Sequence, residues 1–222
     1  MCGRFTLTVD PADLRDAFPE FDFPAQYAPR FNIAPSQPVL VIPNDGTGKV
    51  SFFVWGLVPS WAKDPSIGNR MINARAETLA EKPSFRGALK YRRCLIPADG
   101  FFEWQSQVGS KSKIPHHIRM KSGQPFAFAG LWEDWHSPDG SSIKSCTIIT
   151  TQPNDLMAPI HNRMPVILPP NTYAQWLAPS PAQASDLLPL LVSYPADEMV
   201  AYPVSTLVNS PANDLPEVLQ PV

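Results

Sequence analysis

A cysteine directly follows the initiator methionine, in Met1-Cys2-Gly3-Arg4. A small residue at this position normally permits removal of the methionine, which leaves an α-amine and a thiol on one residue. The ordinary pKa of an α-amine is about 7.7, against about 10.4 for lysine, so far more of it is neutral and nucleophilic at pH 7. The amine can condense with an aldehyde, and the thiol can then close a five-membered thiazolidine ring. Cys2 is therefore predicted to trap aldehydes, the alternative being an ordinary cysteine in a first strand.

Two further side chains could move protons. Glu103 stands among large aromatic residues in Phe101-Phe102-Glu103-Trp104, where desolvation would raise its pKa towards neutrality. The alternating faces of a strand could instead point Glu103 to solvent. His161 lies in a segment bracketed by prolines and is a natural acid or base near neutral pH, although a hydrogen-bonded structural histidine is as common.

Several residues could contact a polyanion. Asn73 is predicted to cap a helix with Arg75 in its first turn, a combination that offers amides and a guanidinium to an anion. Glu77 could instead be the partner of Arg75. Arg4, beside Cys2, is either a phosphate contact or a solvated surface charge. Trp61 could stack on a base, although two tryptophans this close together are more often core residues.

Composition limits the classes of protein that fit. The chain has 222 residues, expected to form one domain over 1–222, and its 27 prolines are spread through apolar segments as in a loop-rich globular fold. The net charge is −2, so any nucleic acid must bind a local patch. Three cysteines match no metal or disulfide framework and favour a reducing cytoplasm, with association with the nucleoid if the source is bacterial. We expect a monomer with no cofactor, no metal site and no contact with a membrane. His116 and His117 are not expected to bind one metal ion together, because adjacent side chains on a strand point to opposite faces.

The elements that must position these residues are short strands interspersed with helices. A helix is expected after the Asp10 cap, and a hairpin from 39–42 and 50–55. The arrangement predicts an α+β fold with a largely antiparallel, barrel-like core and short flanking helices. The other expected elements are helices over 74–81, from Pro83, after the cap Asn171 and over 182–188, and strands over 126–131, 146–151 and 166–168.

The order of the motifs resembles one known family over nearly the whole chain. The motifs are MCGR, NIAP (32–35), WGLVPSW (55–61), INARAET (72–78), CLIPADGFFEW (94–104), IHNRMP (160–165) and the tail VNSP (208–211) followed by Asn213-Asp214. This pattern is similar to the SOS response-associated peptidase (SRAP) family. The resemblance implies recognition of abasic sites in single-stranded DNA and a covalent thiazolidine link through the N-terminal cysteine. That is the chemistry that Cys2 suggests by itself.

The resemblance also implies roles for individual residues. Cys2 corresponds to the nucleophile, Asn73 to the active-site asparagine, and Glu103 and His161 to the catalytic acid and base. The implied DNA contacts are Arg4, Arg75, Arg163, Trp61 and Thr150, with Thr150 lining the pocket. The chain departs from many relatives at Met164, where they carry another arginine, and its Pro-Ser-Trp loop has the single Trp61.

Other functions remain open at this level. The family suggests autoproteolytic removal of residues before the cysteine, and a Schiff base would permit strand cleavage by β-elimination. Glutamine amidotransferases also begin Met-Cys-Gly, but they use an Asn-Gly element and this chain contains no Asn-Gly dipeptide. A non-catalytic reader of modified DNA bases is the third alternative, and it would bind reversibly without needing Cys2.

Overall fold

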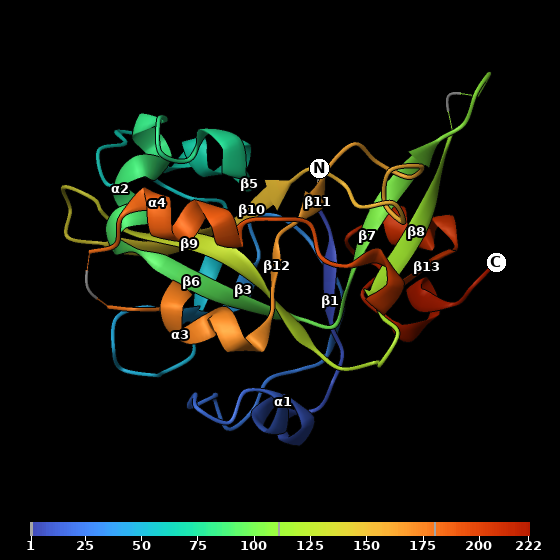
Figure 1. The fold of residues 1–222 in the computed structure, drawn as a ribbon, viewed down its shortest axis with the longest axis horizontal. Helices are drawn as coiled ribbons and strands as arrows, with labels where there is room; N and C mark the ends of the chain where they lie inside the picture. The colour runs from blue at the N-terminus through green and yellow to red at the C-terminus, as the bar shows by residue number, and fades with distance from the viewer. Residues whose placement is uncertain (1, 111, 180) are drawn as a thin grey trace.

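One of the two sheets closes into a five-stranded barrel in the computed structural model, which describes residues 2–110, 112–179 and 181–222 (Figure 1). Neighbouring strands of the barrel are antiparallel except for β10 and β4, which run parallel. The expected antiparallel barrel-like core is confirmed, including the hairpin of β3 and β4. In order around the barrel the strands are β4 (Ser51–Trp55), β3 (Pro38–Pro43), β6 (Arg93–Ala98), β9 (Phe126–His136) and β10 (Ser142–Thr151).

Three very short strands extend the barrel sheet at its margins. They are β5 (Asn73–Arg75) and β11 (Met164–Pro165), which both pair with β10, and β12 (Ile167–Leu168), which pairs with β9.

A second, antiparallel sheet stands beside the barrel (Figure 1). Its strands, in order, are β13 (Met199–Pro203), β8 (Lys113–Met120), β7 (Gly100–Ser106), β1 (Phe5–Leu7) and β2 (Arg30–Ile33). The chain passes from the barrel into this sheet at Asp99, between β6 and β7. Its carboxylate accepts hydrogen bonds from Thr6, Thr8 and Val9, which fixes β1 against β7.

Short helices cover the outside of the strands (Figure 1). Helix α1 (Pro11–Ala17) begins as expected, because the Asp10 side chain accepts from the backbone N–H groups of Ala12 and Asp13. Pro83 opens α2 (Pro83–Tyr91), which confirms that helix as well. The remaining helices are α3 (Tyr173–Trp176) and α4 (Ala184–Leu187), with 3-10 turns at Pro65–Arg70, Ala76–Thr78, Pro170–Thr172, Leu188–Leu190, Ala196–Glu198, Thr206–Asn209 and Pro216–Leu219. None of the helices in the described ranges has the length and apolar character needed to cross a bilayer.

The expected helix over 74–81 is wrong. Asn73 lies in β5, whose backbone pairs in parallel with β10, with Asn73 opposite Ile148 and Arg75 opposite Thr150. This pairing holds the segment extended, so Asn73 caps no helix, and only the 3-10 turn Ala76–Thr78 follows. Asn171 is likewise inside a 3-10 turn and caps no helix.

Aromatic side chains join β1 to the barrel. The Phe5 ring makes edge-to-face contacts with Trp55, at 5.2 Å between centroids, and with Phe128 at 5.7 Å. All three are buried, and burial of one such side chain contributes roughly 1.5–3 kcal/mol. Phe5 therefore anchors the first strand in the seam between the two sheets, three residues after Cys2.

Candidate active site

Cys2 is fully buried in the seam. The Asn73 Nδ2 donates to the Cys2 carbonyl at 2.7 Å, and the Cys2 thiol lies 3.9 Å from the Arg4 carbonyl. Burial raises the pKa of the Cys2 thiol, and the nearby carboxylate of Glu103 raises it further. The thiol is thus protonated at neutral pH, and ring closure requires a base to accept its proton.

Glu103 reaches Cys2 because β1 and β7 are antiparallel neighbours. Phe5 pairs with Phe101, and the Phe102 N–H donates to the Arg4 carbonyl, so the residues after Phe102 run beside those before Arg4. The Glu103 side chain is only 2% exposed, and the alternative of a solvent-facing carboxylate is wrong. Both faces of β7 are buried over residues 100–103, so the alternation of faces does not bring Glu103 to solvent. Burial raises the pKa of Glu103 to about 7.

His161 completes a pair with Glu103. Its Nε2 lies 4.0 Å from Glu103 Oε2, and its Nδ1 accepts from the Arg163 backbone N–H at 3.1 Å. The Arg163 carbonyl is also 3.3 Å from Nδ1, but the N–H can only donate and so decides the tautomer. The neutral ring therefore carries its proton on Nε2, towards Glu103. Burial lowers the pKa of His161, which favours this neutral form at pH 7.

Asn73 offers an acceptor next to the reactive residue. Its Nδ2 is committed to Cys2, while its buried Oδ1 has no hydrogen-bond partner within the described ranges. Buried polar atoms are rarely left unpaired. A substrate hydroxyl or amine at this point would satisfy Oδ1. The structure therefore brings together all four predicted catalytic residues: Cys2, Asn73, Glu103 and His161.

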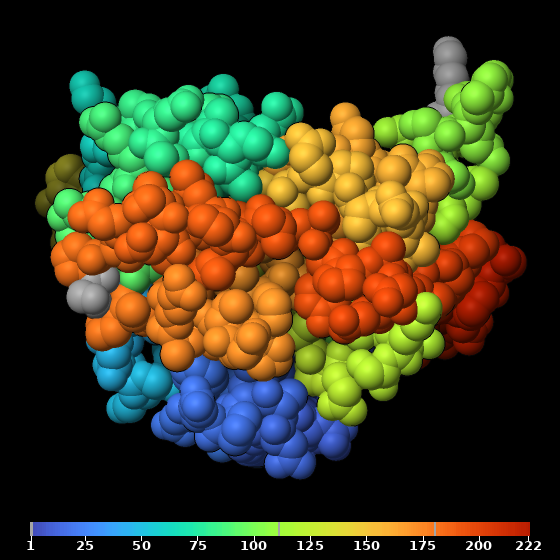
Figure 2. Space-filling view, viewed as in Figure 1, coloured from blue at the N-terminus to red at the C-terminus, as the bar shows by residue number. Residues whose placement is uncertain are grey.

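Two predicted DNA contacts are open to solvent. Arg75 is exposed at the end of β5, and Trp61 is 58% exposed, whereas Trp55 is fully buried. The core alternative for Trp61 is therefore wrong. The space-filling view is hollowed at its upper edge, between the green segment that includes α2 and the β7–β8 hairpin, above the gold segment before β11 (Figure 2).

Arg4 is held by the far end of the chain. Its Nη1 donates to Asn32 Oδ1 at 2.8 Å and to the Val208 carbonyl at 2.7 Å, and its guanidinium lies 5.7 Å from the Trp104 ring centroid. The fully buried Asn32 also donates to the carbonyls of Val208, Ser210 and Asn213. This network gives the NIAP and VNSP motifs a shared structural role.

Arg163 and Thr150 lie together below the surface. The Arg163 side chain is 9% exposed and forms a two-point ion pair with Glu77, while its Nη2 also donates to the Thr150 carbonyl. Glu77, which the sequence offered as a partner for Arg75, is thus bound to Arg163. The role of Arg163 as a phosphate contact stays a prediction, and its guanidinium is engaged elsewhere in this structure.

Sequence reasoning missed two residues that act on the site. Lys113 at the start of β8 adds positive charge that, after burial, helps set the pKa values of Glu103 and His161, lowering both. The Gln105 side chain donates to the Pro159 carbonyl at 3.0 Å and docks the segment before His161 on β7. The alternating pattern of β7 could have drawn attention to Gln105, which lies two residues after Glu103; Lys113 carries no such signal.

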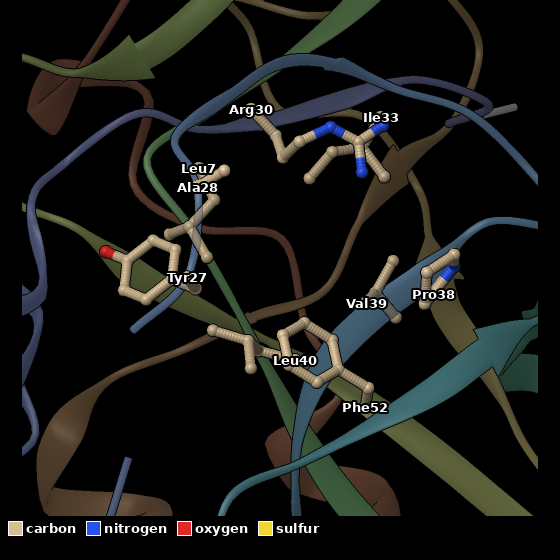
Figure 3. Close-up of a pocket in the computed structure, with 9 residues that line it drawn as sticks. All are labelled: Leu7, Tyr27, Ala28, Arg30, Ile33, Pro38, Val39, Leu40 and Phe52. Carbon is tan, nitrogen blue, oxygen red and sulfur yellow. The ribbon is translucent and has the colours of Figure 1, made fainter. Parts of the chain in front are cut away.

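A separate apolar hollow of about 200 Å³ is lined by residues of β1, β2, β3 and β4 and of the segment before β2 (Figure 3). Its lining includes none of the four predicted catalytic residues, and the one cation there, Arg30, is paired with Asp214. The residues that line this hollow are Leu7, Tyr27, Ala28, Arg30, Ile33, Pro38, Val39, Leu40 and Phe52.

Within the described residues, no cluster of three or more His, Cys, Asp or Glu could hold a metal ion.

Known proteins resemble this chain over nearly its full length. Abasic site processing protein YoqW of Bacillus subtilis is 51% identical over 223 residues, covering 99% of each chain. Abasic site processing protein HMCES of Rattus norvegicus is 33% identical over 271 residues, covering all of this chain and 76% of the relative. A crystal structure of a protein from Bacteroides thetaiotaomicron covers 100% of both chains with a TM-score of 0.88 and 27% identity.

The family model for SOS response associated peptidase (SRAP) matches residues 1–211. The match spans both sheets and every residue of the candidate site. The chain therefore belongs to the SRAP family, together with relatives named abasic site processing proteins.

Proposed function

We propose that this protein processes abasic sites in single-stranded DNA by forming a covalent thiazolidine link between Cys2 and the sugar aldehyde. The observation that carries the proposal is the enclosure of Cys2 with Glu103, His161 and Asn73 in one seam. An aldehyde is the group that an aminothiol captures, and a ring-opened abasic sugar presents one at C1′. The names of the relatives point to the same lesion.

The reaction requires removal of Met1, because an amide nitrogen cannot attack an aldehyde. The free amine of Cys2 adds to C1′ and gives a carbinolamine. Loss of its hydroxyl as water forms a Schiff base, and addition of the thiol sulfur to the C=N carbon closes the ring. The net change is the loss of one water, with no oxidant or reductant.

Glu103 and His161 supply the proton transfers. With a pKa of about 7, Glu103 is present in both protonation states at neutral pH. The carboxylic acid can protonate the departing hydroxyl, and the resulting carboxylate can accept the proton of the thiol. The Nε2–H of His161 faces this carboxyl and can exchange protons with it. The Asn73 amide fixes the carbonyl of Cys2, which orients the amine and the thiol together.

The strand is held through its backbone. Arg75 and Trp61 are exposed, so Arg75 can contact a phosphate and Trp61 can stack on a base, and Arg4 lies two residues from the nucleophile. Phosphate and stacking contacts carry little sequence information, so we expect recognition of the lesion with slight preference for the flanking bases. Met164, where many relatives carry an arginine, is fully buried in β11 and presents no side chain to the DNA.

A denaturing gel tests the proposal. Protein with Met1 removal confirmed by mass is incubated with a single-stranded oligonucleotide that contains one abasic site, beside the Cys2→Ala variant. We expect a shifted band that requires Cys2. This band should disappear when the aldehyde is first reduced with borohydride. The absence of such a band would refute the covalent reaction and favour either a reversible reader or an amidotransferase, and glutaminase activity would identify the latter.

Peptidase and lyase activities are secondary in this proposal. The same amine and Glu103 could promote β-elimination from the Schiff base before the thiol closes the ring. Autoproteolysis would be detected with a variant that carries extra residues before Cys2, as release of the peptide that these residues form. Autoproteolysis needs the Cys2 thiol, so Cys2→Ala should abolish it. β-Elimination needs only the α-amine, which Cys2→Ala keeps once Met1 is removed, so this activity should persist in that variant.

A further inference from the structure

The loop between β4 and β5 starts and ends beside the candidate active site. Trp55 at the end of β4 pairs with Cys146 of β10, and Asn73 at the start of β5 pairs with Ile148, on the edge of β10 that faces away from β9. The two ends of the loop therefore lie two residues apart along β10, or about 7 Å. Because Asn73 also donates to the Cys2 carbonyl, the loop begins and ends next to the residue that holds the nucleophile.

The tip of this loop is a tight turn that exposes an indole. The Ala62 N–H donates to the Pro59 carbonyl at 2.9 Å, so Ser60 and Trp61 form the centre of the turn. Both central residues are exposed, and the exposed fraction of Trp61 is 58%. Tryptophan is highly buried on average in folded proteins, so an indole displayed on a turn favours a binding role.

Two buried side chains of β9 and β10 hold the backbone on either side of this tip. The Trp135 Nε1–H of β9 donates to the Ala62 carbonyl at 2.7 Å, and the Ser145 Oγ of β10 accepts from the Val58 N–H at 2.9 Å. Val58, Ala62 and Trp135 also form a small hydrophobic cluster at the same place. The backbone is thus fixed immediately before and after the turn, while the two central side chains extend into solvent.

We propose that Trp135 and Ser145 are positioning residues that hold the turn 59–62, so that Trp61 is already in place to stack on an unpaired base beside the lesion. The inference rests on the proposed function, because it takes single-stranded DNA as the ligand. Ordering a mobile side chain on binding weakens affinity by roughly 2- to 10-fold, and a fixed turn avoids this loss. Every base has a flat face, so the stacking needs no particular sequence.

Replacement of single hydrogen-bonding groups tests this role. Trp135→Phe keeps an aromatic ring in the cluster and removes the N–H, Ser145→Ala removes the acceptor for Val58, and Trp61→Ala removes the stacking surface. Trp176→Phe is the matched control, because it removes another buried indole bond, from Nε1 to the Cys94 carbonyl at 2.9 Å, on helix α3. All variants are compared at a temperature at which urea unfolding shows them to be folded.

Two measurements are made on each variant. The first is reversible affinity, as a function of salt, for a single-stranded oligonucleotide in which a tetrahydrofuran analogue without an aldehyde replaces the abasic sugar. The second is the single-turnover crosslinking rate as a function of the concentration of abasic oligonucleotide, which separates binding from the reaction.

The positioning role predicts weaker binding without slower chemistry. Trp61→Ala should weaken affinity about 5- to 150-fold, and Trp135→Phe and Ser145→Ala should each weaken it about 2- to 10-fold. The salt dependence should not change, because no charge is removed. The crosslinking rate at saturation should stay within about twofold of wild type, and the concentration that gives half of this rate should rise.

A double variant shows whether the effect passes through the indole. Trp61→Ala with Trp135→Phe should bind no more weakly than Trp61→Ala alone, because without the indole there is nothing left to position. If Trp135→Phe weakens binding equally in the two backgrounds, or if Trp176→Phe weakens binding as much, the inference is wrong.

Other results would also overturn the inference. Wild-type affinity in Trp61→Ala would exclude stacking, and wild-type affinity in folded Trp135→Phe would exclude the clamp. Ser145→Ala provides the same test from the other side of the turn if Trp135→Phe does not fold. Failure of the wild-type protein to crosslink, with these differences in affinity intact, would refute the proposed reaction and leave the positioning role standing.

Discussion

Replacing Glu103 with glutamine should stabilise the protein, by an amount that grows with pH. Burial raises the pKa of this carboxyl from an ordinary 4.5 to about 7 in the folded state. Because the folded-state pKa is the higher one, the folded protein holds the proton more tightly. The stability that this provides is fully present below pH 4.5 and is lost as the pH rises through 7. Glutamine has nearly the same shape and never ionises, so it avoids this loss.

The size of the effect follows from the two pKa values. One pKa unit corresponds to about 1.4 kcal/mol, so Glu103→Gln should gain about 3 kcal/mol at pH 8, about 1 kcal/mol at pH 5 and almost nothing at pH 4. For a chain of this length, about 3 kcal/mol corresponds to a rise in Tm of roughly 6–12 °C.

Urea unfolding of wild type and Glu103→Gln at pH 4, 5, 6 and 8 measures this gain directly. The Glu81→Gln variant serves as the control, because an exposed carboxylate should give a small change that does not grow between pH 5 and 8. A gain for Glu103→Gln that is equal at every pH, or a loss of stability at pH 8, would show that the Glu103 carboxyl is not destabilised by burial. In that case the acid and base roles assigned to it would lose their physical basis.

The same geometry makes further predictions about rate, binding and stability. The crosslinking rate of wild type should change slope near pH 7, and Glu103→Gln should remove this inflection and slow the reaction about 10²- to 10⁴-fold, measured by single-turnover gels over pH 5–9. Asn73→Ala should lose the 2.7 Å bond to the Cys2 carbonyl and slow crosslinking about 10-fold, without changing affinity for the tetrahydrofuran oligonucleotide. Arg75→Gln should lower the salt slope of reversible binding by about 0.7, and an unchanged slope would remove Arg75 from the DNA contacts. Phe5→Ala should cost about 3–5 kcal/mol in urea unfolding, since its ring packs on both Trp55 and Phe128.

Local signals in the sequence predicted the elements that depend on local chemistry. The Asp10 cap and Pro11 specified α1, and the turn residues between β3 and β4 specified a hairpin. Asn73 shows where this reasoning stops. Its cap-like sequence indicated a helix, but pairing with β10, more than seventy residues later in the chain, holds the segment extended. Local propensity is weak compared with a complete set of strand hydrogen bonds.

The sequence predicted four residues that lie close together in the structure, but not the contacts between them. Cys2 was identifiable from its position alone, and the aromatic neighbours of Glu103 indicated a desolvated carboxyl. Whether Glu103 faced solvent depended on both faces of β7 being covered at this point, which is a property of the whole fold. The pairing of Glu77 with Arg163 joins residues 86 positions apart, and no local pattern distinguishes it from a pair between Glu77 and Arg75.

The hold of the chain's last segment on Arg4 has a consequence during synthesis. The Val208 carbonyl that binds Arg4 lies 204 residues downstream, and Asp214 accepts from the backbone of Phe31 and Asn32. The ribosome must therefore translate the chain as far as Val208 before Arg4 can acquire this partner. Until then the nascent N-terminus lacks this contact, so the surroundings of Cys2 reach their final form only after the segment that holds Arg4 has been synthesised.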